Sequence, residues 1–70
     1  MQKELASAII VSTQMLSKSF DEVDELLRRI EDEDERRAFL RALGESMGKI
    51  ISGIECPIFK AFPDLDPDKL

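Results

Sequence analysis

The apolar residues of the first thirty positions recur at steps of three and four, the spacing of one face of an α-helix. Glycine and proline are absent from residues 1–43, and strand-like alternation never persists. We therefore expect an all-α chain whose first helix covers about residues 3–31. The stripe expected to face a second helix consists of Leu5, Ile9, Leu16, Phe20, Val23, Leu27 and Ile30.

A second apolar ridge lies beside this stripe and consists of Ala8, Val11, Met15 and Leu26, while Ile10 is expected to point away from both. The N-terminal half of the helix is thus apolar almost all round. Because one neighbouring helix covers only one side, the second ridge needs a further partner. The sequence predicts that this second ridge forms a homodimer interface.

An acidic run from Glu31 to Glu35 interrupts the apolar pattern and predicts a turn. Asp32 and Glu35 have the spacing of an N-terminal helix cap, so a second helix over about residues 34–56 should begin here. Its apolar side is expected to contain Leu40, Leu43, Met47, Ile50, Ile51, Ile54 and Ile58. The two helices form a long antiparallel hairpin, and two hairpins would make a four-helix bundle.

Proline governs the expected C-terminal structure. Pro57 lacks a backbone donor and should bias Cys56 away from helical angles, so it is expected to end or kink the second helix. A short turn over residues 58–62 and an extended tail rich in Pro and Asp over residues 63–70 should follow. The apolar residues Phe59, Phe62 and Leu65 are expected to fold back over the bundle end rather than form a free recognition segment.

Two features leave alternatives open. A capping-box pattern begins at Ser19, so a break near Ser17 and Ser19 would give a monomeric three-helix bundle instead. The apolar stripe continues through this region without a change of helical phase, which favours a single helix. Small residues at Gly44, Gly48 and Ser52 predict a close helix crossing, either within the hairpin or between two copies.

The size of the chain also favours a dimer. A single domain of 70 residues buries only about 60% of the surface of its unfolded chain, so its core is marginal. One cysteine and no histidine exclude an internal disulfide and the usual zinc sets, which leaves oligomerisation as the stabilising device.

Charge and hydropathy restrict the partners. The net charge is −5, and residues 21–35 contain nine acids and two arginines, net −7, so neither nucleic acid nor an anionic membrane is an expected partner. No signal peptide or apolar stretch long enough to span a bilayer is recognisable, so a cytoplasmic location is expected.

The sequence gives little support for a catalytic, cofactor-binding or metal-binding site. The carboxylates lack the pattern of a calcium loop, and Cys56 has no histidine to act as its base, so no catalytic, cofactor-binding or metal-binding residue is assigned. Three functions fit the pattern. The first is a noncatalytic, homodimeric protein–protein interaction module. The others are an acidic, antitoxin-like inhibitor of a basic partner protein, and an accessory subunit or carrier of a small apolar ligand.

Overall fold

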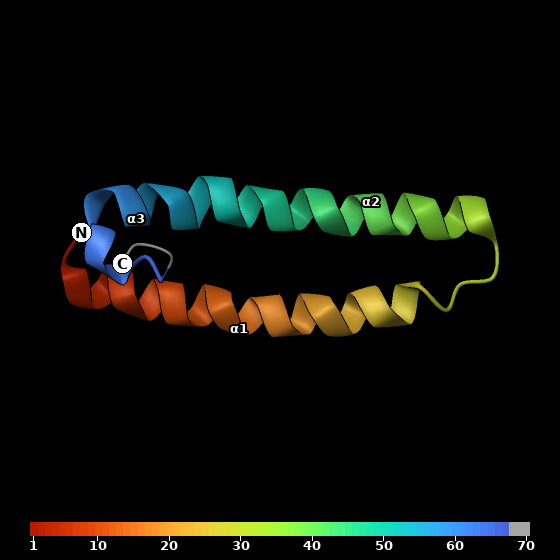
Figure 1. Cartoon of the computed structure of the whole chain (residues 1–70), viewed down its shortest axis with the longest axis horizontal. Helices are drawn as coiled ribbons and strands as arrows, with labels where there is room; N and C mark the ends of the chain where they lie inside the picture. Colours follow the sequence, from red (N-terminus) through yellow and green to blue (C-terminus); the bar gives the residue numbers. More distant parts are fainter. Residues whose placement is uncertain (68–70) are drawn as a thin grey trace.

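The computed structural model describes residues 1–67, and over this range the chain is a helical hairpin without strands. One arm is α1 (Lys3–Leu27). The other arm is almost continuous and consists of α2 (Glu33–Ile50), the π-helical turn η1 (Ile51–Glu55) and α3 (Cys56–Ala61). The 3-10 turn η2 (Pro63–Leu65) follows. The arms run antiparallel and the C-terminal segment returns to the N-terminal end of α1, which confirms the all-α hairpin (Figure 1).

Helix α1 runs unbroken through Ser17 and Ser19, so the alternative of three shorter helices is wrong. No glycine or proline interrupts this stretch, and a serine can remain in a helix when its neighbours favour helix. The helix ends at Leu27, earlier than the expected residue 31. The amides of Arg29 and Ile30 donate to the carbonyls three residues before them, which tightens the chain into the loop.

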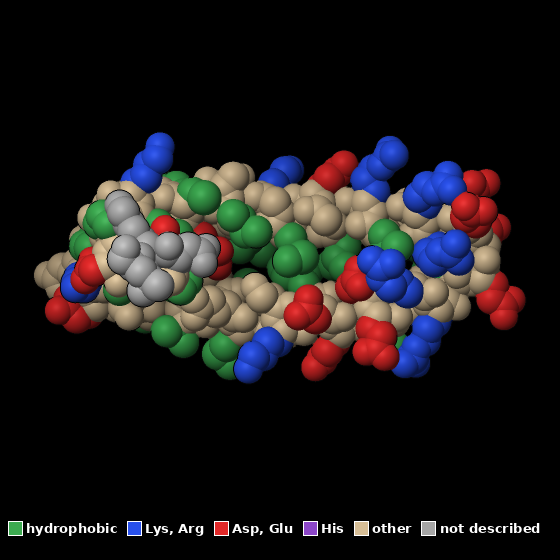
Figure 2. All heavy atoms as spheres, in the orientation of Figure 1, with side chains coloured by type: hydrophobic (Ala, Val, Ile, Leu, Met, Phe, Trp, Pro, Cys, Tyr) green, Lys and Arg blue, Asp and Glu red, His purple; other side chains and the backbone are tan. Residues whose placement is uncertain are grey.

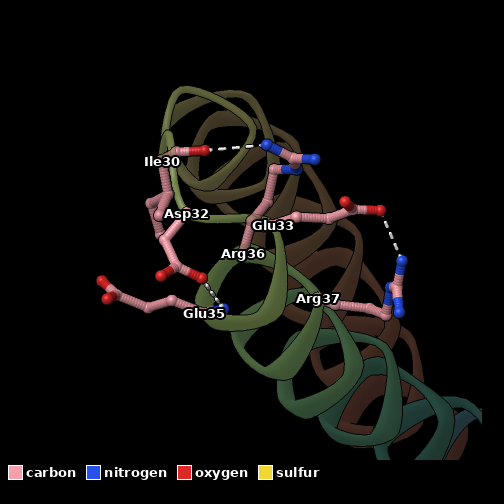
Figure 3. Close-up of polar contacts among 6 residues, drawn as sticks. All are labelled: Ile30, Asp32, Glu33, Glu35, Arg36 and Arg37. Atoms are coloured by element: carbon pink, nitrogen blue, oxygen red, sulfur yellow. Dashed lines mark hydrogen bonds and ion pairs between the residues drawn. The ribbon is translucent and has the colours of Figure 1, made fainter.

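Side chains of the loop fix the start of α2 (Figure 3). The amide of Glu35 donates to Asp32 Oδ1 at 3.0 Å, which confirms the predicted cap. Arg36 reaches back and donates to the Ile30 carbonyl at 2.9 Å, and Arg37 pairs with Glu33 at 2.6 Å. The cap satisfies one free amide of the helix, and the Arg36 bond holds the loop at Ile30 against the first turn of α2.

Replacement of the capping residue should therefore weaken the hairpin. We expect Asp32→Ala to lower the free energy of unfolding by about 1 kcal/mol, because an amide of the first turn of α2 loses its acceptor. Asp34→Ala is the matched control, since it removes the same charge from the same turn without removing the Glu35 hydrogen bond. Urea unfolding followed by circular dichroism measures both. Equal losses in the two variants would mean that charge alone, and not the cap, stabilises this turn.

Pro57 was expected to end or kink the second helix, and the structure shows that the second arm does not end there. Cys56 has helical angles, φ −60° and ψ −45°, and α3 continues to Ala61 where a turn over residues 58–62 was expected. The π-helical turn explains this continuation. The amide of Cys56 donates to the Ile51 carbonyl five residues earlier, and this wider turn accommodates the proline ring and its missing donor.

The buried core lies where the N-terminal part of α1 packs against α3 and η2. Ala6, Ile10 and Ile58 are buried, and the half-buried residues Ile9, Phe59, Phe62 and Leu65 pack against them. Thr13 is also buried, with its hydroxyl donating to the Ile10 carbonyl at 3.0 Å. This internal bond lets a polar residue occupy the face of α1 that packs against the second arm.

This core corrects the predicted orientation of α1. Ile10 was expected to point away from both ridges, yet only 5% of it is exposed. Leu5, Leu16 and Val23, which were assigned to the hairpin stripe, are exposed instead. The spacing of Ala6, Ile10 and Thr13 is also helical. When a helix is apolar on nearly all sides, its periodicity alone does not identify the face that packs against another helix. The C-terminal residues that pack against the cluster containing Ile10 determine which face of α1 is buried.

The C-terminal segment folds back as expected for its apolar residues, but residues 63–65 form a 3-10 turn where an extended tail was expected. Lys3 of α1 donates to the carboxylate of Asp64 and ties this turn to the start of the chain. That hydrogen bond lowers the pKa of Asp64 below its ordinary value. Residues 68–70 of the predicted tail lie outside the described range.

Candidate interaction surface

Helix α1 carries an apolar face that nothing in the described chain covers. The predicted interface residues Ala8, Val11, Met15 and Leu26 are all exposed, and Val11, Met15 and Leu26 are 54%, 66% and 58% exposed. At about 100° per residue these four lie within an arc of about 60°, roughly opposite the face formed by Ala6, Ile10 and Thr13. The structure therefore brings the four residues together on the side of α1 away from α2.

Sequence reasoning missed part of this surface. Leu5, Leu16 and Val23 are 56%, 45% and 41% exposed, and their helical positions adjoin the predicted ridge. We define the outer face of α1 as Leu5, Ala8, Val11, Met15, Leu16, Val23 and Leu26. Figure 2 shows hydrophobic side chains that protrude from the lower edge of α1, and others along the open seam between α1 and α2. The apolar surface is thus wider than the predicted ridge.

The second arm adds exposed apolar side chains of its own. Phe39, Ile51 and Ile54 are exposed. Ile51 and Ile54 were expected on the packed side of the helix, but they lie in the π-helical turn, whose hydrogen bonds span five residues instead of four and shift the phase of the apolar stripe. The Cα trace measures only 16 Å along its shortest axis, so the two arms form a single layer of helices.

The small residues of α2 do not form a close crossing within the hairpin. A Cβ atom placed on Gly44 or Gly48 would meet no other atom within 4 Å, and both glycines are exposed. Ser52 is exposed and its hydroxyl donates to the Gly48 carbonyl at 2.8 Å. The intramolecular crossing is therefore wrong, because these residues face away from α1, and the crossing between copies stays a prediction.

The acidic end of the molecule partly neutralises itself. Asp24 accepts from Arg28 at 2.8 Å, and Glu25 accepts from Arg29 at 3.1 Å, each one helical turn apart. The Asp24 hydrogen bond raises the pKa of Arg28 above its ordinary value. With the pair between Glu33 and Arg37, three carboxylates of the acidic segment already have a cation beside them. This reduces the field that the segment presents to a basic partner.

Among residues 1–67 there is neither a cluster of metal-ligating side chains nor a membrane-spanning helix. Within residues 1–67, no three His, Cys, Asp or Glu side chains come together as metal ligands would. No helix of this part of the chain is long and apolar enough to cross a bilayer. Cys56 is a free, exposed thiol. An open hollow on α2 is lined by Asp34, Arg37, Ala38 and Arg41, and Arg37 is already engaged with Glu33.

The outer face of α1 is therefore the feature of this structure that most needs a functional explanation. Exposed apolar side chains follow one side of this helix from Leu5 to Leu26, with Ser12 and Ser19 among them, and water-exposed apolar surfaces of this kind mark interaction sites. No protein-family model, curated protein or solved structure matches the chain, so the assignment of this surface depends on the chain's own geometry.

Proposed function

We propose that this protein is a noncatalytic helical interaction module that forms a homodimer through the outer face of α1. The observation that carries the proposal is the exposure of Val11, Met15 and Leu26 opposite the packed face of the same helix. Two hairpins joined through this face make a four-helix arrangement, in which each α1 has an apolar neighbour on two sides.

The total exposed surface supports a partner of substantial size. A compact protein of 8.0 kDa is expected to expose about 4,500 Å², whereas this chain exposes 5517 Å². The excess of about 1,000 Å² is comparable to the roughly 800 Å² that each partner contributes to a standard protein interface. A second copy on the outer face would therefore return the exposed surface per chain to an ordinary value.

The other two functions receive less support. An acidic inhibitor would present free carboxylates to a basic partner, but Asp24, Glu25 and Glu33 are already paired with arginines. A carrier of an apolar ligand would bring its methionines to one cleft. Met15 instead lies on the outer face and Met47 is half-buried on the second arm. The homodimer instead requires only the apolar side chains that are already exposed on the outer face of α1.

Light scattering coupled to gel filtration tests the proposal. At micromolar concentration we expect a particle of twice the 8.0 kDa chain mass, which dissociates toward a single chain as the protein is diluted. Circular dichroism on the same samples establishes that the chain is helical at each concentration. A well-folded species that keeps the mass of one chain at every concentration would contradict the homodimer.

A further inference from the structure

The outer face of α1, together with the serines at positions 12 and 19, is close to symmetric in side-chain polarity when read from either end. Exposed residues are placed symmetrically about the midpoint between Met15 and Leu16, so that Leu5 mirrors Leu26, Ala8 mirrors Val23 and Ser12 mirrors Ser19. Steps of three and four separate these positions, so they form one stripe along the helix. Val11, at the edge of the stripe, mirrors the half-buried Phe20, which is also apolar.

Such a pattern suits a helix that packs against an antiparallel copy of itself. In a two-fold dimer the same patch is used by both chains, and if residue i contacts residue j, then j contacts i. Antiparallel packing about the midpoint places each residue opposite its mirror position. The large side chains at the two ends of the stripe then meet each other, and the two small serines meet as well, which gives close packing without a clash.

We infer that the second copy docks antiparallel on the outer face, with the two-fold axis between Met15 and Leu16. Leu5 of each chain packs against Leu26 of the other, and Ser12 lies opposite Ser19. This inference depends on the proposed homodimer and specifies its orientation and register. The dimer is then an elongated particle with the α1–α2 loop of one chain at each end.

The distribution of charge favours this orientation over a parallel one. Residues 16–47, which surround the α1–α2 loop, carry ten acids and six bases, net −4. The rest of the chain carries five acids and four bases, net −1. A parallel dimer would place the two −4 halves side by side, whereas the antiparallel dimer places each beside a −1 half. Because the molecule extends 46 Å, the two loops would then lie several Debye lengths apart, each about 8 Å at physiological salt.

Engineered disulfides test the register directly. In a Cys56→Ser background, which removes the only native thiol, Ser12→Cys and Ser19→Cys chains are mixed in equal amounts and oxidised mildly. In the proposed register residue 12 faces residue 19 of the other chain, while two residues 12 lie about 10 Å apart along the helix, too far for a disulfide. We therefore expect the mixed disulfide to exceed either same-site disulfide by about tenfold or more.

Mass spectrometry of the cross-linked peptides distinguishes the outcomes. A Gln14→Cys chain in the same background, whose thiol lies off the stripe, measures cross-linking by random collision. Predominant same-site disulfides would indicate a parallel dimer, and a dimer without cross-links above the Gln14→Cys level would place the seam elsewhere. Either result overturns the antiparallel register. The first leaves the proposed homodimer through the outer face intact, and the second leaves a homodimer whose seam is not the outer face of α1. If the uncross-linked wild-type chain is monomeric by light scattering, the proposed function itself fails.

Discussion

Substitution of Val11 and Met15 by glutamate is expected to convert the dimer into a folded monomer. Both side chains are more than half exposed in the hairpin, so the change leaves the intramolecular core intact. In the proposed dimer each substitution occurs twice, and four carboxylates would enter an apolar seam. Full burial of an aliphatic side chain is worth about 1.5–3 kcal/mol, and even about 1 kcal/mol at each of the four positions raises the dissociation constant about a thousandfold.

A matched variant separates this effect from that of added negative charge. Gln14→Glu with Ala38→Glu also adds two carboxylates at exposed positions, but neither position belongs to the outer face of α1. We expect this control to remain dimeric by light scattering at concentrations where the Val11 and Met15 variant is monomeric. Retention of the dimer by the Val11→Glu/Met15→Glu chain would show that the seam does not lie on this face of α1.

The second large effect concerns the stability of the hairpin. Replacement of Ile58 by alanine should lower the free energy of unfolding by about 2–4 kcal/mol, because Ile58 is 4% exposed and packs with Ala6 and Ile10. A domain of this length has a total stability of roughly 4–10 kcal/mol, so the loss is a large share of it. The buried cluster of the described chain contains few large side chains, and each one therefore contributes a large share of the free energy of unfolding.

Urea unfolding at one fixed protein concentration measures this loss, since dimerisation makes the apparent stability depend on concentration. Ile51→Ala is the matched control because Ile51 is 46% exposed and lies in the same arm. Its expected loss is below about 1 kcal/mol, since little apolar surface returns to water. Similar losses at the two positions would mean that the packing around Ile58 does not stabilise the hairpin more than an exposed isoleucine does.

Local sequence patterns were sufficient for the type and order of the main elements. The long apolar periodicity predicts a first helix over about residues 3–31, of which 3–27 are α1, and the acidic run with Asp32 and Glu35 predicts the loop and the cap of α2. These features depend on interactions between residues at most four positions apart, which a sequence displays directly. The ridge at Ala8, Val11 and Met15 was predicted as unpaired, and the structure leaves it exposed.

Other features follow from packing between residues far apart in the chain. The periodicity of α1 specifies a helix that is apolar on more than one side, whereas contacts between distant segments select the side that is buried. Phe62 and Leu65 of the C-terminal segment pack against the cluster that contains Ile10, while Leu16 and Val23 remain in water. Likewise, Pro57 signals a helix end locally, yet a π-helical turn accommodates it and carries the arm onward. Burial of apolar surface depends on what lies opposite it, and helical periodicity does not contain that information.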